Sequence, residues 1–93
     1  MTVLRINKFI SAKGKSVELY EFLCSLKGYI NASEGNLLYE VAKDTDDEER
    51  FLVVEKWDSI ESHQKSVKNF PKEEMSGAMD LFGDSPEGKY YNL

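Results

Sequence analysis

The chain has 93 residues, of which 41% are hydrophobic and 31% are charged. This length fits one domain, residues 1–93, and the composition is that of a folded soluble protein, which excludes disorder over the whole chain. The formal net charge is -5 and the lysines are dispersed, which argues against nucleic acid or an anionic membrane as a partner.

The opening residues and the apolar runs predict a cytoplasmic protein. Residues 1–8 lack the long apolar run of a signal peptide, and no segment has the length and apolarity of a membrane span. Cys24 is the only cysteine, so neither an intrachain disulfide nor a metal-binding cysteine pair can form.

The spacing of apolar side chains predicts first a strand and then a helix. Over residues 3–10, alternation places Val3, Asn7 and Phe9 on one face of a strand. Over residues 15–32, apolar side chains recur at helical spacing and form one stripe: Leu19, Phe22, Leu23, Leu26 and Ile30. Gly28 lies near the end of this helix and is expected to bend or fray it.

Two strands joined by an acidic loop are predicted next, over residues 37–43 and 51–57. The run 44–49 lacks the glycine and the spacing of an EF-hand, so we interpret it as a solvated hairpin loop and predict no metal site. The strand 51–57 is apolar on both faces, with Val53 on one face and Leu52 and Val54 on the other. Because a half-exposed antiparallel strand would alternate apolar with polar residues, both faces must be covered, one by helices and one by a second sheet.

Asp58 is predicted to cap the next helix, over residues 59–69, whose inward side chains are Ile60, His63, Val67 and Phe70. A short helix follows Pro71, with inward side chains Met75, Ala78, Met79 and Phe82. A loop then leads to an edge strand over residues 89–93. This order of elements predicts an α+β, ferredoxin-like βαββαβ fold with a four-stranded antiparallel sheet.

Three stretches resemble the antibiotic biosynthesis monooxygenase domain family: EGNLLYEV over residues 34–41, RFLVVEKW over residues 50–57, and ESH over residues 61–63. Members carry an E-G-x-x-x-Y-E stretch, a strand ending in E-x-W and a histidine early in the following helix. The resemblance implies a homodimer, a dimeric α+β barrel in which two four-stranded sheets pack together.

The resemblance also implies a range of activities. Some members oxidise aromatic polyketides or quinols with dioxygen and without metal, flavin or haem, whereas others degrade haem, isomerise a phosphorylated molecule or have no demonstrated activity. Haem-degrading members need a tryptophan in the second helix and a later histidine as iron ligand. Here Ser66 stands near the tryptophan position and no histidine follows His63, so we expect no haem and no other cofactor.

Three residues are candidates for catalysis. His63, the only histidine, is suited to deprotonate a phenol or hydroquinone, and the alternative is a structural, hydrogen-bonded histidine. Asn7 is an unusual strand residue that could donate a hydrogen bond to a substrate oxygen, unless it lies at an edge or the surface. Trp57 could donate through its indole N–H, or could simply belong to the core.

Four aromatic residues are candidates for the walls of an aromatic-binding cavity, although ordinary packing is the alternative for each: Tyr39, Phe9, Phe22 and Phe82. Glu40 and Glu55 interrupt otherwise apolar strands, and we expect them to be hydrogen-bonded, either buried or at the interface between two copies.

Two functions from different classes remain open at this stage. The first is a cofactor-independent monooxygenase acting on a small aromatic, quinol or polyketide-like substrate. The second is a non-catalytic homodimeric protein of the same fold, either a stress-related protein or one that binds a small ligand in the same cavity. In both cases the partners are a second copy of the chain and a small aromatic molecule.

Overall fold

The computed structural model describes residues 2–93 of the chain. Its elements follow in the order β1 (Val3–Ile10), α1 (Ser16–Ser25), α2 (Lys27–Ala32), β2 (Asn36–Lys43), β3 (Arg50–Trp57), α3 (Ile60–Asn69), α4 (Lys72–Ala78), the 3-10 turn η1 (Met79–Leu81) and β4 (Glu87–Asn92). None of the helices in this part of the chain has the length and apolarity to cross a membrane.

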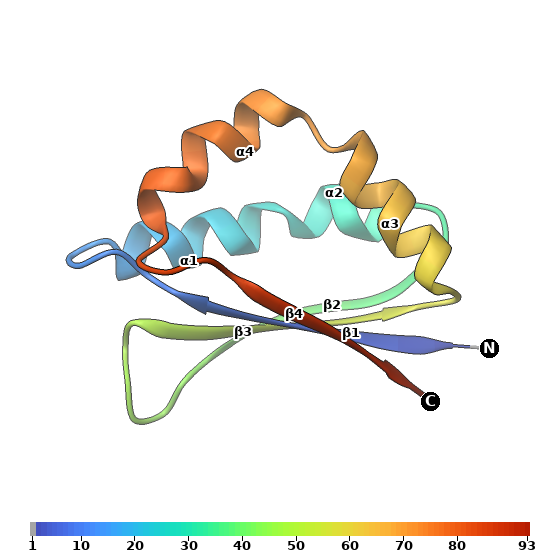
Figure 1. Ribbon diagram of the computed structural model, residues 1–93, viewed down its shortest axis with the longest axis horizontal. Coiled ribbons are helices and arrows are strands. Elements are labelled where there is room, and N and C mark those ends of the chain that lie inside the picture. The colour runs from blue at the N-terminus through green and yellow to red at the C-terminus, as the bar shows by residue number, and fades with distance from the viewer. Residues whose placement is uncertain (1) are drawn as a thin grey trace.

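The four strands form one sheet in the order β2-β3-β1-β4, and every neighbouring pair is antiparallel. All the helices cover one face of this sheet, and the other face carries none (Figure 1). The predicted ferredoxin-like α+β fold is therefore confirmed. The register places Asn7 of β1 between Val53 of β3 and Gly88 of β4, in the middle of the sheet.

The core lies between α1 and the central strands. Leu19 and Leu23 of α1 are fully buried against Val53 of β3, as their helical spacing requires. Tyr39 of β2 joins them, and its hydroxyl donates a 2.6 Å hydrogen bond to the Leu23 carbonyl, which ties the end of α1 to the sheet. Trp57, at the end of β3, is also fully buried.

The long first helix is broken at Leu26, not at Gly28 as expected. Ser25, the last residue of α1, donates a 2.5 Å hydrogen bond from its hydroxyl to the Phe22 carbonyl. A serine that bonds back to its own helix competes with the backbone ladder and bends the helix. The Leu26 N–H accordingly reaches the Leu23 carbonyl, three residues back, at 3.3 Å.

Helix α3 differs from its prediction in its cap and in its inward side. Ser59, not Asp58, is the N-cap, and its hydroxyl accepts a 3.1 Å hydrogen bond from the Ser62 N–H. Ile60 and Val67, expected to be inward, are 37% and 59% exposed.

The row of α3 that faces the fold contains His63 and Ser66, both buried. The small side chain of Ser66 lets α2 come close, since its hydroxyl shares a 2.9 Å hydrogen bond with that of Ser33 and its carbonyl accepts one of 2.7 Å from the Tyr29 hydroxyl. Polar contacts through Ser66 therefore join α3 to α2, while Val67 and Phe70 of the predicted stripe face the space between the helices and the sheet.

Helix α4 stands away from the sheet, so two of its predicted inward residues are not buried. Met75 and Met79 are exposed, whereas Ala78 is buried and Phe82 is partly buried. The Phe82 ring packs against that of Phe9 with ring centroids 5.8 Å apart, which fixes the chain just after η1. The space left under α4 becomes part of a cavity.

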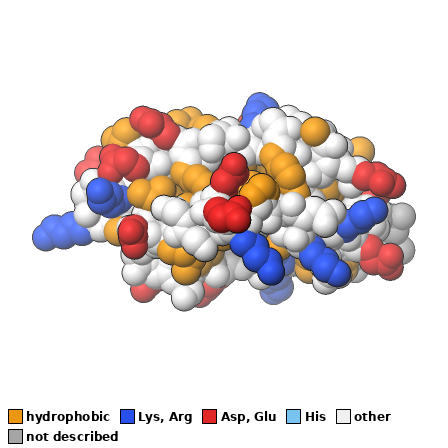
Figure 2. Space-filling view, turned by 90° about the horizontal axis from the view of Figure 1, so that it is seen from above, with side chains coloured by type: hydrophobic (Ala, Val, Ile, Leu, Met, Phe, Trp, Pro, Cys, Tyr) orange, Lys and Arg blue, Asp and Glu red, His pale blue; other side chains and the backbone are white. Residues whose placement is uncertain are grey.

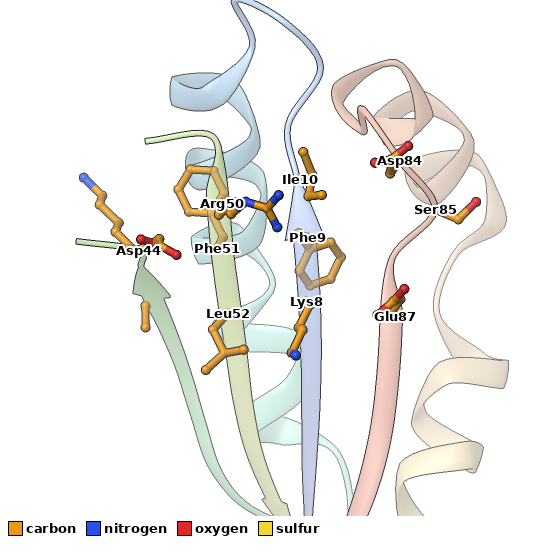
Figure 3. A pocket seen from close by; sticks show the side chains of 12 residues that line it. Lys8, Phe9, Ile10, Asp44, Arg50, Phe51, Leu52, Asp84, Ser85 and Glu87 are labelled. Carbon is orange, nitrogen blue, oxygen red and sulfur yellow. The ribbon is translucent and has the colours of Figure 1, made fainter. Parts of the chain in front are cut away.

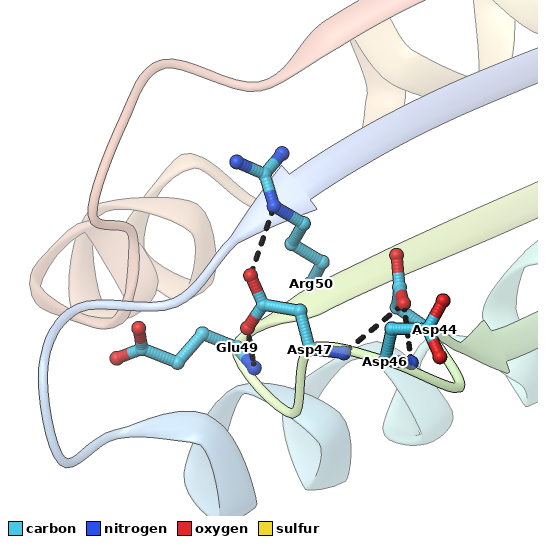
Figure 4. Close-up of polar contacts among 5 residues, drawn as sticks. All are labelled: Asp44, Asp46, Asp47, Glu49 and Arg50. Carbon is cyan, nitrogen blue, oxygen red and sulfur yellow. Dashed lines mark hydrogen bonds and ion pairs between the residues drawn. The ribbon is translucent and has the colours of Figure 1, made fainter.

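The acidic run between β2 and β3 is a turn that binds its own backbone (Figure 4). The Asp44 carboxylate accepts hydrogen bonds from the N–H groups of Asp46 and Asp47, at 2.7 and 3.1 Å. Asp47 in turn accepts bonds from the Glu49 N–H and from Arg50 Nε, both at 3.0 Å. This is the behaviour of aspartates in turns, and it confirms the predicted hairpin loop.

The face of the sheet without helices carries apolar side chains interspersed with charged ones, among them Lys8, Glu40 and Lys56. By strand alternation and register it presents Leu4, Ile6, Ile10, Leu38, Leu52, Val54 and Tyr91. Burial of these residues is only partial within one chain, and Leu38 and Tyr91 are exposed. The two-sided apolar character predicted for β3 is therefore present, with one of its sides open.

Candidate active site

A cavity of about 350 Å³ lies between the sheet and the helices. Its walls are mainly apolar and include the four aromatic residues predicted from the sequence: Phe9, Phe22, Tyr39 and Phe82. Side chains from α3, α4 and the segment before β4 also line it, among them Met75 and Pro86. Figure 2 looks onto the helix side, where hydrophobic side chains reach the surface in a band broken by acidic ones.

The floor of the cavity carries a buried carboxylate, Glu55 of β3. Its Oε2 accepts a 3.0 Å hydrogen bond from Asn7 Nδ2, and its Oε1 accepts one of 2.9 Å from the indole Nε1 of Trp57. Burial raises the pKa of Glu55, whereas the hydrogen bond from Trp57, the charge of Arg5 and the hydrogen bond from Asn7 act in the opposite direction. The carboxyl group is held in one orientation by two donors from two strands.

Arg5 lies beside Asn7 on the inward face of β1. Its Nε donates a 3.0 Å hydrogen bond to Asn7 Oδ1, and its Cζ lies 4.5 Å from the centre of the Tyr90 ring on β4. Strand pairing explains this arrangement, because Arg5 is registered with Glu55 on one side and with Tyr90 on the other. The guanidinium group therefore reaches the cavity from the middle of the sheet.

His63 of α3 closes the polar end of the cavity and is only 7% exposed. Its Nδ1 lies 2.6 Å from the Tyr90 hydroxyl, and its ring meets the rings of Trp57 and Tyr90 edge to face, each at 5.4 Å. Burial, and after it the charge of Arg5, lowers the pKa of His63 to about 4. The imidazole is therefore uncharged at neutral pH, with Tyr90 on Nδ1 and Nε2 left for a ligand.

The structure brings most of the predicted site residues to one place. His63 and Asn7 both line the cavity, and Asn7 also donates to the buried Glu55 carboxylate. Trp57 lies beneath, fully buried, and its indole N–H already donates to Glu55. Of the two glutamates that interrupt strands, Glu55 is buried and hydrogen-bonded inside the chain, whereas Glu40 is exposed on the open face.

Sequence reasoning did not single out Arg5 or Tyr90. A signal for Arg5 was available, because alternation puts this charged residue on the same face as Asn7 and Phe9. No local pattern identifies Tyr90, since it enters the site only because β4 pairs with β1 and α3 crosses above it.

A larger hollow, of about 720 Å³, opens at the end of the sheet near the β2–β3 loop. Figure 3 shows Lys8, Leu52 and Glu87, from β1, β3 and β4, around it. It combines charges of both signs with apolar side chains, and neither His63 nor Glu55 lines it. Residues 2–93 contain no group of three histidine, cysteine, aspartate or glutamate side chains arranged to hold a metal ion.

A four-stranded antiparallel sheet covered by helices on one face defines a protein of the ferredoxin-like α+β class, and the aromatic-walled cavity ending in a histidine and a carboxylate is its candidate site. The chain belongs to the antibiotic biosynthesis monooxygenase family, whose model matches residues 2–75.

Solved structures show the same fold. A protein from Pseudomonas aeruginosa is 21% identical, with a TM-score of 0.86 over 99% of this chain and 94% of that chain. A putative antibiotic biosynthesis monooxygenase from Nitrosomonas europaea is 14% identical, with a TM-score of 0.90 over 99% and 89%. SnoaB, a cofactor-independent oxygenase from Streptomyces nogalater, is 11% identical, with a TM-score of 0.85 over 99% and 92%. No curated protein sequence matches the chain significantly.

Proposed function

We propose that this protein is a cofactor-independent monooxygenase that oxidises a small aromatic, quinol or polyketide-like substrate with dioxygen in the inner cavity. The observation that carries the proposal is an uncharged, nearly buried imidazole at the polar end of an aromatic-walled cavity. Membership of the antibiotic biosynthesis monooxygenase family and the likeness of fold to SnoaB support it.

The chemistry needs no external reductant, because the substrate supplies the electrons. A hydroquinone loses one hydroxyl proton to a base, and the resulting anion passes electrons to dioxygen and forms a peroxide at a ring carbon. Loss of water from the peroxide leaves a hydroxyquinone. One oxygen atom enters the ring, the other leaves as water, and all four electrons of the reduction come from the hydroquinone.

His63 is the base in this proposal. With a pKa of about 4, its imidazole is unprotonated at neutral pH, and a proton can enter at Nε2 when Nδ1–H donates to the Tyr90 hydroxyl. So low a pKa also makes it a weaker base than a histidine that titrates near neutral pH. The charge of Arg5, which opposes protonation of the imidazole, also stabilises the anion that the substrate becomes. The two effects partly offset each other.

Asn7 and Trp57 have different roles in this proposal. Asn7 lines the cavity, so the second N–H of its amide is available to a substrate oxygen while the first donates to Glu55. Trp57 acts through Glu55, because its N–H donates to that carboxylate and its side chain has no exposure. It is a positioning residue.

The proposed working form is a homodimer formed through the open face of the sheet. Ile6, Leu52 and Val54 lie side by side there, on β1 and β3, and no helix within residues 2–93 covers them (Figure 1). A second sheet packed on this face would bury them and complete the barrel that the family resemblance implies.

Oxygen uptake tests the proposal. The purified protein is supplied with 1,4-naphthohydroquinone and related hydroquinones, and uptake is corrected for autoxidation. We expect uptake above background, and a loss of roughly 100-fold or more in kcat/KM for His63→Ala, the usual contribution of a positioned base. Ile60→Ala, on the same helix but outside the cavity, is the matched control and should keep full activity.

Two results would contradict the enzyme proposal. Turnover that survives His63→Ala intact would remove His63 as the base. Ligand binding without oxygen uptake for any hydroquinone would instead favour the non-catalytic binding protein. Unfolding curves of both variants show whether a loss of activity comes from a loss of fold.

A further inference from the structure

Arg5 is a half-buried cation without a carboxylate partner. The ion pairs among residues 2–93 are Lys15–Glu18, Arg50–Asp47 and Lys65–Glu34, and none includes Arg5. A guanidinium group has five N–H donors. Only its Nε donates to a protein acceptor within the described residues, at Asn7 Oδ1, so the four N–H bonds of the two Nη atoms have no protein acceptor there.

The nearest carboxylate does not neutralise this charge directly. Glu55 is separated from Arg5 by the Asn7 amide, which bonds to both, and its two oxygens already accept from Asn7 and Trp57. The charge of Arg5 instead acts on His63, whose pKa it helps to lower, and both side chains contact Tyr90. The Nη groups of Arg5 are not sealed in the core, because Ser11 Oγ is the one buried side-chain polar atom without a partner among the described residues, so an anionic ligand in the cavity can reach them.

Gly88 allows the guanidinium group to take this position. It pairs with Asn7 in the register of β1 and β4, and Arg5 lies across it. A Cβ atom on residue 88 would overlap Arg5 Nη2 and would lie 2.5 Å from Arg5 Cζ and from Asn7 Oδ1. Any side chain on residue 88 would therefore move Arg5 or Asn7.

We propose that Arg5 is the anchor of an anion site, and that the cavity selects aromatic ligands carrying a planar, negatively charged oxygen group. A guanidinium group binds such a group through two parallel hydrogen bonds. The ring of the ligand would lie among the aromatic walls near Phe9 and Phe82, with His63 at its edge. Lys72, which also lines the cavity, adds a second positive charge.

This inference specifies the class of substrate that the cavity of the proposed function would take. It rests on the proposed function only in that respect. Two kinds of ligand carry such a planar anionic group, an aromatic carboxylate and an acidic hydroxyquinone. The second is also the type of product that the proposed oxidation releases. Binding is measured without oxygen, so the anion site and the oxygenase activity fail separately.

The test compares isosteric ligands of different charge by equilibrium dialysis at pH 7 under nitrogen. The first pair is 2-naphthoate and 2-naphthamide, and the second is 2-hydroxy-1,4-naphthoquinone and its 2-methoxy ether. We expect the wild-type protein to bind the anion of at least one pair about 10-fold or more tightly than its neutral partner. The pair that shows the preference identifies the source.

Three variants locate the anion site. Arg5→Gln should bind the anion and its neutral partner equally while keeping the affinity for the neutral one, which shows that the cavity is intact. Gly88→Ala keeps the charge but displaces the guanidinium group, so it should lose most of the preference. Lys68→Gln removes an exposed positive charge from α3 outside the cavity and should leave the preference unchanged.

Equal affinity for anion and neutral partner in the wild-type protein, or no binding of either, would overturn the inference. A preference that survives in Arg5→Gln would do the same, because the anion would then be held elsewhere. A clear preference that depends on Arg5, in a protein without oxygenase activity, would keep the anion site and overturn the proposed reaction.

Discussion

Glu55 connects the core to the cavity at the scale of single residues. One of its oxygens is held by Trp57 from below and the other by Asn7 from the neighbouring strand. Both donors look catalytic in the sequence, since they are polar or amphipathic side chains in apolar strands. In the structure each donates a hydrogen bond that orients the Glu55 carboxylate. Both residues therefore act on a ligand first of all by positioning Glu55.

The depressed pKa of His63 leads to a prediction about stability and pH. As pH falls, an imidazole in the unfolded chain binds a proton near its ordinary pKa of 6.5, whereas the folded one does so only near 4. The unfolded state therefore binds more protons in this window, and His63 makes the protein less stable as pH falls from 6.5 to 4. Below pH 4 the stability that the unprotonated His63 contributes is lost in full.

Urea unfolding at pH 7.5 and pH 4.5 of the wild type and His63→Asn measures this effect. The free energy of unfolding of the wild type should fall by about 2 kcal/mol more than that of the variant, a value reduced for the solvent contact that the ring keeps. The raised pKa of Glu55 acts with the opposite sign, and the comparison with the variant cancels it. An equal fall in both proteins would show that the imidazole titrates normally.

Helix ends and bends decide where the cavity lies at the scale of elements. The first helix is interrupted at Leu26, and the second part, α2, contacts α3 through Tyr29, Ser33 and Ser66. Gly35 makes the turn from α2 into β2 at a φ of +88°, a conformation that favours glycine, and a Cβ there would collide with Asp58 and Ser62 at the start of α3. The end of α2 and the start of α3 are therefore held close together at Gly35.

The cap of α3 gives a prediction at this scale. Ser59→Ala removes the hydroxyl that accepts from the Ser62 N–H and should lower the free energy of unfolding by about 1 kcal/mol. Asp58→Ala is the matched control, because the exposed Asp58 carboxylate accepts only from neighbouring hydroxyls and should cost less. Chemical denaturation of the two variants decides between them. A larger loss for Asp58→Ala would identify Asp58 as the functional cap.

The molecule as a whole has two chemically different sheet faces. One is covered by helices and encloses the cavity, and the other presents aliphatic side chains with only partial cover. Monomeric proteins seldom expose an apolar surface of this kind over several strands. The open face is therefore the part of the molecule on which the proposed homodimer depends.

Charge placed on the open face should dissociate the dimer. Val54→Lys lies between Ile6 and Glu40 in the sheet register and would put an ammonium group into the apolar contact. We expect sedimentation to show a dimer for the wild type at micromolar concentration and a folded monomer for this variant. Val17→Lys, at a 63% exposed position of α1, is the control and should remain a dimer. A wild type that is monomeric under these conditions would rule out the dimer.

The order of the elements and the two apolar faces of β3 could be read from the sequence alone. Both follow from the local spacing of apolar side chains, since a period near two or near 3.6 fixes which residues share a face. The same spacing failed for Ile60 of α3, which it predicted to be inward and which is exposed, whereas Val67 lines the cavity with His63. The inward side of α3 depends partly on the hydrogen bond that Ser66 makes with α2. The spacing of residues along α3 carries no information about α2.

The sequence by itself therefore determined the ferredoxin-like framework, the common strand face of Asn7 and Phe9, and the inward placement of His63. Only the tertiary structure decided which polar groups meet. Asn7 bonds to Glu55 across 48 residues of chain, and His63 meets Tyr90 across 27. Such contacts depend on strand register and on the exclusion of water, and both arise only when distant segments pack together.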